Sequence, residues 1–220
     1  MIAYDFDGID LDWEYPVTRQ GTPQDYDNYV LLCHAIRQAF DTAGHSSIDT
    51  HPWLLTMAIP TNPQKLQQGY NLRELSKHID WFHIMSYDIN GAGNENAGSN
   101  TDMTYISDTI TDSILNQGIS PDQLVFGMAS YGRSMVLTNK ECNTAGCPIN
   151  GPGYAGCSGE QGFLPYFEIQ EEYVTTKQYD SLLINKDTGS MEMILNGGDI
   201  FVSFDLDETY EIKREWYLSK

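Results

Sequence analysis

The sequence predicts an α/β protein in which helices cover a parallel sheet and a small α+β subdomain is inserted near the C-terminus. Two observations support this fold class. Strand-like apolar runs alternate with helical patterns along residues 1–133, which is typical of a parallel sheet covered by helices. Over residues 134–204, cysteines, glycines and short aromatic runs replace that alternation. A structureless loop of this length is uncommon, so we expect an inserted subdomain there and a return helix over residues 205–220.

The first predicted strand carries four carboxylates between Asp7 and Glu14. Successive side chains of a strand point to opposite faces, so Asp10, Asp12 and Glu14 would share one face. The apolar residues between them would share the other face and be buried. Placing carboxylates beside a buried face costs folding free energy unless they have hydrogen-bonding or charged partners, so such residues are retained where they have a chemical function. Asp7 falls outside this alternation, and we assign it a structural role.

Crowded carboxylates of this kind are expected to split in pKa, so that one is ionised while another holds a proton near neutral pH. A protonated carboxylic acid beside an ionised one can cleave a glycosidic bond. Glu14 is the expected proton donor, because it lies at the C-terminal end of the strand, where parallel α/β proteins form their ligand sites.

Three other interpretations of the acidic segment fit the sequence less well. A calcium loop fits poorly, because Trp13 and the lack of a central glycine break the helix-loop-helix pattern. A solvated edge strand conflicts with the apolar alternate positions. A magnesium site of a phosphotransferase would require a glycine-rich phosphate loop, which the sequence lacks. The favoured interpretation is an enzyme that uses these carboxylates as a catalytic pair, and the second is a metal-binding site.

The other elements follow in order along the chain. Thr22 is a helix cap, Pro23 stands at the first helical position, and helical spacing continues to Phe40 before Gly44 ends the helix. Further strands are expected over residues 53–59, 81–87 and 124–129, and further helices over residues 72–79, 103–114 and 208–218.

The acidic segment, with Phe6 before it and Tyr15-Pro16 after it, resembles the fourth-strand signature Asp-x-x-Asp-x-Asp-x-Glu of the family-18 chitinases. Three further matches follow in the family's order. Met85-Ser86-Tyr87-Asp88 resembles the Met-x-Tyr-Asp of the sixth strand, and residues 127–133 resemble the Tyr-Gly-Arg of the seventh. The segment Cys142–Ile169 resembles the insertion domain of fungal chitinases of the killer-toxin-like subgroup.

The resemblance implies an incomplete TIM (β/α)8 barrel with an inserted α+β chitinase subdomain. Four predicted strands resemble the family's fourth to seventh, whereas a complete barrel needs about 250 residues. The first three strands and the eighth have no counterpart in this sequence. We therefore expect a fragment of a longer protein, with a decayed remnant as the alternative, and poor folding of the fragment alone.

The implied activity is that of an endo-type chitinase, which hydrolyses β-1,4 bonds between N-acetylglucosamine units with retention and substrate assistance. Glu14 would protonate the glycosidic oxygen and then activate water. Asp12 would hold the acetamido N–H, and Asp10 would share a proton with Asp12. Tyr87 would hydrogen-bond the acetamido carbonyl. The resemblance implies no cofactor and no metal.

The remaining residues implied for substrate binding are Tyr15, Met85, Asp88, Tyr131 and Arg133. Taken alone, Tyr15, Met85 and Tyr131 are typical of core residues. Asp88 and Arg133 lie near predicted strand ends, where barrel loops carry function, so they are less readily explained as packing.

One local departure from the family follows Asp88. The family usually continues with His-Gly-x-Trp, where this chain has Asn90-Gly91-Ala92-Gly93. Gly93 replaces a Trp that would stack on sugar, so affinity on that side is expected to differ.

Other functions on the same fold stay open. A chitin-binding lectin usually changes the acid at Glu14, which is present here, whereas a killer-toxin docking subunit would keep it. An inactive truncated remnant is the third alternative. The expected partner is chitin or a chito-oligosaccharide, and a complete protein is expected to be a monomer.

Composition agrees with a neutral polysaccharide ligand. The formal charge is −19, with 31 acidic against 12 basic residues, which argues against binding to nucleic acids or anionic membranes. The sequence has no apolar run of about 20 residues that could span a membrane.

Cysteine spacing predicts the cellular setting. Three of the four cysteines, Cys142, Cys147 and Cys157, fall in one loop-rich segment, which predicts one disulfide and an oxidising, secreted setting. Together with the family resemblance, this implies an extracellular or cell-wall protein. Zinc is disfavoured, because that segment has no histidine and no Cys-x-x-Cys spacing. Cys33 stands at an apolar helical position and is expected to be a buried thiol.

Overall fold

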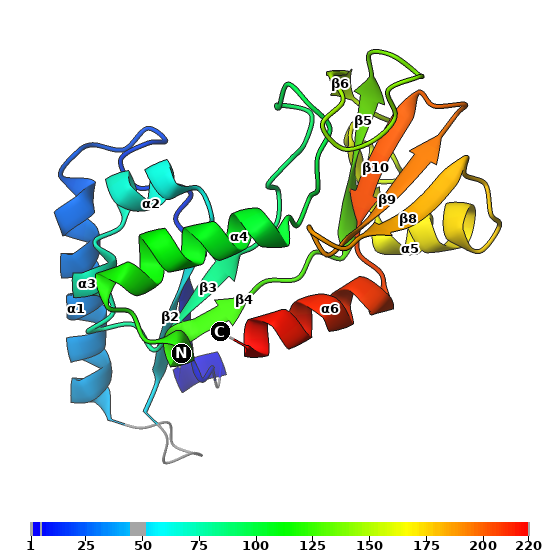
Figure 1. The fold of residues 1–220 in the computed structure, drawn as a ribbon. Coiled ribbons are helices and arrows are strands. Elements are labelled where there is room, and N and C mark those ends of the chain that lie inside the picture. Colours follow the sequence, from blue (N-terminus) through cyan, green and yellow to red (C-terminus); the bar gives the residue numbers. More distant parts are fainter. Residues whose placement is uncertain (1, 5, 45–51, 220) are drawn as a thin grey trace. The chain divides into compact units, whose positions relative to one another are not determined.

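The computed structural model describes residues 2–4, 6–44 and 52–219. The chain forms two compact units, and most of their helices and strands are labelled in Figure 1. The first unit comprises Met1–Met85 and Asp108–Gly127, and the second comprises Ser86–Ser107 and Met128–Lys220. Compared with the predicted boundaries after residues 133 and 204, the second unit also takes in residues 86–107, residues 128–133 and the C-terminal helix.

The first unit is built on a four-stranded parallel sheet in the order β1-β2-β3-β4. Its strands are β1 (Gly8–Leu11), β2 (Leu54–Pro60), β3 (Trp81–Met85) and β4 (Leu124–Phe126). The predicted parallel sheet is therefore confirmed, with each strand shorter or shifted by a few residues. Gly8 allows β1 and β2 to approach each other closely at this position, because a Cβ there would lie 2.1 Å from the Leu54 carbonyl oxygen.

Helix α1 (Asp25–Ala43) packs against β2 through one apolar stripe. The stripe contains Tyr29, Cys33 and Phe40, which are buried at the helical spacing that the sequence predicted. Gly44 ends the helix with a φ of 77°, as its position predicted. The predicted start is wrong, because the helix begins at Asp25 and Gln24, not Thr22, occupies the cap position. On the strands, the side chains on one face of the sheet form the core: Leu55, Met57, Ile59, Phe82 and Ile84.

Two short helices follow β2. Helix α2 (Pro63–Gly69) was not predicted, although Asn62 caps it by accepting from the Lys65 N–H and Pro63 occupies its first position. Helix α3 (Leu72–Leu75) is shorter than the predicted helix over residues 72–79. Backbone hydrogen-bonded turns continue from its end to Ile79.

The segment predicted as a helix over residues 103–114 has three parts. Helix α4 covers Met103–Thr109, a wider π turn covers Ile110–Ile114, and a 3-10 turn covers Leu115–Gln117. Gly118 closes the segment in the left-handed conformation, with a φ of 84°. Ile106, Ile110 and Ile114 are buried, so the apolar periodicity was interpreted correctly even though the helix is not regular.

The second unit is built on an antiparallel sheet in the order β6-β5-β10-β9-β8, and β7 also pairs with β5. Its strands are β5 (Tyr131–Leu137), β6 (Ile149–Pro152), β7 (Phe163–Pro165), β8 (Ser181–Asn185), β9 (Ser190–Leu195) and β10 (Ile200–Phe204). Helix α5 (Tyr166–Glu168) continues into a π turn over Ile169–Val174, and α6 (Asp207–Leu218) ends the unit. Tyr131 and Arg133 therefore belong to the antiparallel sheet, and not to a parallel strand with β4.

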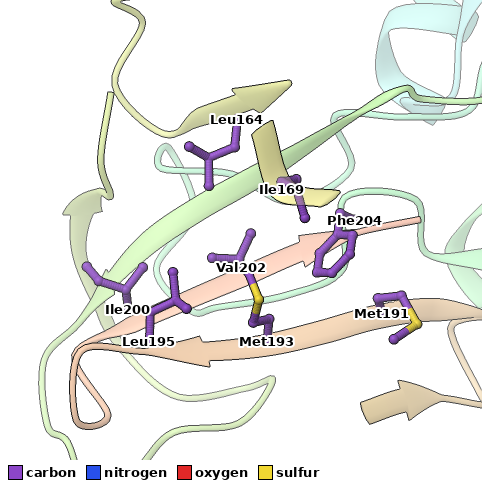
Figure 2. Close-up of a cluster of buried hydrophobic side chains, with 8 residues drawn as sticks. All are labelled: Leu164, Ile169, Met191, Met193, Leu195, Ile200, Val202 and Phe204. Carbon is purple, nitrogen blue, oxygen red and sulfur yellow. The ribbon is translucent and has the colours of Figure 1, made fainter. Parts of the chain in front are cut away.

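The core of the second unit lies on one face of β9 and β10, as Figure 2 shows. Alternate residues of both strands point to that face, where side chains from β7 and the turn after α5 meet them. The cluster consists of Leu164, Ile169, Met191, Met193, Leu195, Ile200, Val202 and Phe204. Residues on the opposite face, such as Ile194 and Phe201, are also buried, so both strands are buried on both sides.

Helix α6 is fixed to this unit by buried polar contacts. The Lys213 ammonium group donates to the Asp205 carboxylate and to the Gly189 carbonyl. Thr209 donates to the same carboxylate at 2.8 Å, and Tyr210 donates to the Ala129 carbonyl at 2.7 Å. The helix predicted over residues 208–218 is thus confirmed.

The cysteines agree with the sequence prediction. Cys142 and Cys147 form a disulfide, Cys33 is a buried thiol, and Cys157 is an exposed thiol. Among the described residues, no helix combines the length and the apolar character that crossing a membrane requires.

Candidate active site

The acidic segment leaves the sheet earlier than its sequence pattern predicted. β1 ends at Leu11, so Asp12, Trp13 and Glu14 follow the strand and do not continue it. The expected burial of the apolar face is wrong for Ile9, which is 37% exposed, because β1 is the outer strand of the sheet. The acids are also exposed in this structure, in contrast to the water-poor site that was predicted.

Asp10 is held by side chains of the two neighbouring strands. It lies opposite Thr56 in the parallel register, and the Thr56 hydroxyl donates to its Oδ1 atom at 2.6 Å. The Nδ1 atom of His83 on β3 lies 3.1 Å from the same oxygen. The sequence did not single out Thr56 or His83, because only the strand register brings them to Asp10.

Asp12 is the acid of this segment whose pKa is raised. Partial burial raises it first, and the negative charges of Glu14 and Asp10 raise it further. The three acids are therefore coupled, and protonation of Asp12 is favoured by its neighbours.

Tyr15 follows Glu14 directly and contacts its side chain. Burial, together with the charge of Glu14 and a hydrogen bond from the phenol to that carboxylate, raises the pKa of Tyr15 to about 12. The Lys65 ammonium group of α2 lies 4.0 Å from the centre of the Tyr15 ring, in a cation–π arrangement. Arg19 donates to the Glu14 carbonyl oxygen at 3.4 Å.

The turn that carries these acids is anchored through Trp13. The Tyr70 hydroxyl donates to the Trp13 carbonyl at 2.9 Å. The Trp13 ring meets the Tyr29 ring edge to face, with centroids 5.2 Å apart. Two buried tyrosines, from α1 and from the end of α2, thus fix the backbone between Asp12 and Glu14.

Met85 and Asp7 lie at opposite ends of the same sheet. Half-buried Met85 is the last residue of β3, and its carbonyl accepts from the Thr61 hydroxyl at 3.4 Å. Asp7 precedes β1, and its carbonyl accepts from the Leu54 N–H at 2.9 Å while its side chain is exposed. The structural role of Asp7 and the binding role of Met85 stay predictions.

The other predicted residues belong to the second unit, where Asp88 joins two of them. Its Oδ1 atom accepts from the Tyr131 hydroxyl at 2.7 Å and from Arg133 Nε at 2.7 Å. The Asp88 backbone has a φ of 56°, and its N–H donates to the Asn100 side chain at 2.9 Å. The Tyr87 ring lies edge to face with the Tyr131 ring, at 6.2 Å between centroids.

Arg133 also contacts two residues that the sequence did not single out, Glu160 and Phe163. Its Nη1 atom donates to Glu160 at 3.0 Å, and its guanidinium lies over the Phe163 and Tyr131 rings. Burial lowers the pKa of Arg133, but the bonds to Asp88 and Glu160 outweigh it and raise the pKa. Burial, followed by the bond to Asp88, raises the pKa of Tyr131.

A depression of about 250 Å³ adjoins this cluster. Asp88, Arg133 and the loop from Asn90 to Asn94 form part of its wall, and Gln161 and Gly162 form the rest. A Cβ at Gly93 would have no neighbour within 4 Å, so the wall is open at this position. The lining can hydrogen-bond a polar, hydroxyl-rich ligand through amide and charged groups.

The predicted residues thus form two groups, one in each compact unit. The first group is Asp7, Asp10, Asp12, Glu14, Tyr15 and Met85, and the second is Tyr87, Asp88, Tyr131 and Arg133. Within the described part of the chain, no three His, Cys, Asp or Glu side chains are grouped to hold a metal ion.

The whole chain, residues 1–220, matches the family described as glycosyl hydrolases family 18. "Probable chitinase 2" of Drosophila melanogaster is 37% identical over 174 residues, which are 76% of this chain and 34% of that protein. "Endochitinase" of Manduca sexta is 31% identical over 240 residues, with 99% of this chain and 41% of that protein covered.

The fold is similar to that of solved chitinases. The Group IV chitinase of Ostrinia furnacalis in complex with allosamidin matches with a TM-score of 0.87 and 27% identity, over 99% of this chain and 59% of that one. These matches place the chain among the glycoside hydrolases. It belongs to glycosyl hydrolases family 18. It spans about a third of the Drosophila protein and less than two thirds of the Ostrinia chain.

Proposed function

We propose that this chain carries the catalytic acids of a chitinase, which hydrolyses β-1,4 bonds between N-acetylglucosamine units with retention of configuration. The observation that carries the proposal is the coupled set Asp10, Asp12 and Glu14 at the end of a parallel strand, in a chain of family 18. The similarity to proteins named chitinase supports the substrate class.

In the proposed reaction, Glu14 gives a proton to the glycosidic oxygen as the acetamido oxygen of the sugar attacks C1. The bond to the leaving sugar breaks, and an oxazolinium ion forms. Glu14 then takes a proton from water, and the water oxygen attacks C1. The bond between C1 and the acetamido oxygen breaks, which opens the oxazolinium ring, restores the acetamido group and releases the product. Glu14 is therefore acid in the first step and base in the second.

Asp12 stabilises the positive charge of the oxazolinium and accepts from the acetamido N–H. Its raised pKa supports a shared proton with Asp10, since each ionised neighbour makes loss of the Asp12 proton harder. Asp10 is held for this role by Thr56 and His83. The acid trio thus needs partners outside the motif to keep its geometry.

Tyr87 is proposed to hydrogen-bond the acetamido carbonyl. Tyr15, Met85, Asp88, Tyr131 and Arg133 are proposed to bind the sugar chain. The bonds of Tyr131 and Arg133 to Asp88 support a common binding role for these three side chains.

The parallel sheet is proposed to correspond to the fourth to seventh strands of a (β/α)8 barrel, and the antiparallel sheet to an inserted chitinase subdomain. The motif within Cys142–Ile169 supports the fungal killer-toxin-like subgroup, and the Cys142–Cys147 disulfide supports secretion to the cell exterior or cell wall. A monomeric complete protein is part of the same proposal.

The test is turnover of chitohexaose, with the anomer of the first product read by NMR. We expect the β-anomer first, and loss of turnover by more than about 1,000-fold in Glu14→Gln, because both proton transfers are removed. Binding of chitotetraose to Glu14→Gln should persist. The matched control is Asp27→Asn, which removes an exposed acid of the first unit outside the acidic segment and should leave turnover unchanged.

The outcomes separate the alternatives. Binding without hydrolysis by the unmodified chain would favour a lectin or a docking subunit, and neither binding nor hydrolysis would favour an inactive remnant. Equal turnover by the unmodified chain and by Glu14→Gln would refute the mechanism.

A further inference from the structure

Arg133 connects two loops of the second unit. Its Nε atom donates to Asp88, in the segment after β3, at 2.7 Å. Its Nη1 atom donates to Glu160, in the loop between β6 and β7, at 3.0 Å. All three residues belong to the second unit, so this bridge is a property of that unit alone.

The position of Arg133 is set by strand pairing. Arg133 lies opposite Phe163 in the antiparallel register of β5 and β7, and Tyr131 lies on the same face two residues earlier. The Tyr131 and Phe163 rings stack with centroids 4.8 Å apart, and the guanidinium lies 5.2 and 5.5 Å from their centres. The two rings therefore pack against one side of the guanidinium. The carboxylates of Asp88 and Glu160, which accept its hydrogen bonds, determine how it is rotated in its own plane.

The loop that carries Glu160 is shaped to present it. Gly159 and Gly162 adopt φ values of 75° and 76°, a conformation that other residues rarely adopt. The Glu160 N–H donates to the Ser158 hydroxyl at 3.2 Å, and Gln161 pairs with Ala155 in an isolated antiparallel bridge. This short turn directs Glu160, whose side chain is 61% exposed, toward Arg133.

A planar guanidinium held at two of its nitrogens has a defined direction in its plane, whereas one contact leaves rotation about the side chain. Glu160 holds Nη1 and thereby keeps Nε on the Asp88 carboxylate. The same Asp88 oxygen accepts from Tyr131, so a shift of Arg133 changes the environment of both residues. Gln161, the neighbour of Glu160, lines the adjoining depression with Asp88 and Arg133.

We infer that Glu160 is a positioning residue, which orients Arg133 and through it Asp88 and Tyr131 for binding of an N-acetylglucosamine oligomer. The inference rests on the proposed function, because these three side chains are its proposed sugar-binding residues. Glu160 itself need not touch the sugar.

The test uses calorimetry to compare the affinity of four forms of the full chain for chitotetraose, at about 20 mM and about 500 mM NaCl. The electrostatic screening length is much longer than an ion pair at the lower salt concentration and about as long as an ion pair at the higher one. The forms are the unmodified chain, Glu160→Gln, Glu160→Asp and Glu171→Gln. Glu171 is an exposed acid of the same unit outside this cluster, and it serves as the matched control.

We expect Glu160→Gln to weaken binding about threefold to fivefold at low salt, the range of a partly exposed ion pair. The difference should disappear at high salt, because the screened wild-type pair then no longer orients Arg133. Glu160→Asp keeps the charge and should lie between Glu160→Gln and the unmodified chain, and Glu171→Gln should match the unmodified chain.

Two results would overturn the inference while leaving the proposed function intact. One is equal affinity of the unmodified chain and Glu160→Gln at low salt. The other is the same loss at both salt concentrations, which indicates a packing role without charge. Failure of the unmodified chain to bind chitotetraose at either salt concentration would refute the proposed function itself, and this inference with it.

Discussion

Asp10 and Thr56 face each other across β1 and β2, and the Thr56 hydroxyl donates to the Asp10 carboxylate at 2.6 Å. The next strand adds His83, whose Nδ1 atom lies 3.1 Å from the same oxygen. Asp10, the second acid of the motif, is thus oriented by side chains of two strands that lie far from it in the sequence. Its partners are part of the sheet, so the geometry of the acids depends on the parallel register.

Replacement of Thr56 by Val should destabilise the folded chain by about 1 kcal/mol, because a charged acceptor loses a donor while the shape of the side chain is kept. Urea denaturation measures this loss. In a double-mutant cycle with Asp10→Asn, the stability lost by the double variant should be about 1 kcal/mol smaller than the sum of the losses in the two single variants. Strict additivity would show that the hydroxyl contributes nothing through Asp10.

The raised pKa of Asp12 should fall toward its ordinary value of 3.8 when either charged neighbour is neutralised. Glu14→Gln should lower it more than Asp10→Asn, because the charge of Glu14 is the larger of the two effects. Titration of the Asp12 side-chain carbon by NMR measures the shift. A pKa that is the same in both variants and in the unmodified chain would contradict the coupling of the three acids.

The same shift predicts a pH dependence of stability. A carboxyl whose pKa is higher in the folded than in the unfolded chain takes up its proton more readily when folded, so stability is lost as the pH rises from 3.8 through the raised value. Asp12→Asn removes this loss. The free energy of unfolding of Asp12→Asn minus that of the unmodified chain should therefore be larger at about pH 7 than at about pH 3, and urea denaturation at the two pH values measures this difference.

The local signals of the sequence were sufficient for most of the first unit. The apolar run over residues 53–59 and the helix bounded by Pro23 and Gly44 lie close to β2 and α1. Helix α2 was missed although Asn62 and Pro63 are typical of a helix start. The end of β1 at Leu11 could not be predicted, because the alternation of polar and apolar residues continues to Glu14 after strand pairing has stopped.

The candidate site was predicted only in part. The motif identifies the acids, but it does not identify the residues that hydrogen-bond to them and hold them in place. Thr56 and His83 contact Asp10 through a register that the local pattern does not encode. Glu160 contacts Arg133 across 27 residues, through a turn that depends on two glycines. The sequence predicted Arg133 near the end of a parallel strand, and it did not predict that Arg133 lies on β5 of the antiparallel sheet, because β5 begins a few residues after β4 and the sequence shows no break there.

The two free thiols should react at different rates. Cys33 is buried, and burial raises its pKa to about 11, so little thiolate forms at about pH 8. Cys157 is exposed, although local desolvation and Glu168 raise its pKa as well. A thiol reagent such as DTNB should label one site in the folded chain, more slowly than free cysteine, and two sites after unfolding in urea. Labelling that persists in folded Cys157→Ser would contradict this assignment.

The buried pair of Lys213 and Asp205 offers the sharpest test of how α6 is held. Their side chains are 2% and 1% exposed, and Thr101 and Thr209 also donate to the Asp205 carboxylate. Lys213→Met leaves that carboxylate buried without a cation, and it should cost about 3–5 kcal/mol of unfolding free energy.

Lys140→Met is the matched control, because Lys140 pairs with Asp199 at 2.8 Å with its side chain 57% exposed. Water and salt screen such a pair, so its loss should cost no more than about 1 kcal/mol in the same urea denaturation. Adding Asp205→Asn to Lys213→Met removes the unpaired charge and should recover part of the lost stability. Equal losses in Lys213→Met and Lys140→Met would mean that the buried charge is compensated by the threonine hydroxyls alone, and that Lys213 is not what holds α6 to the sheet.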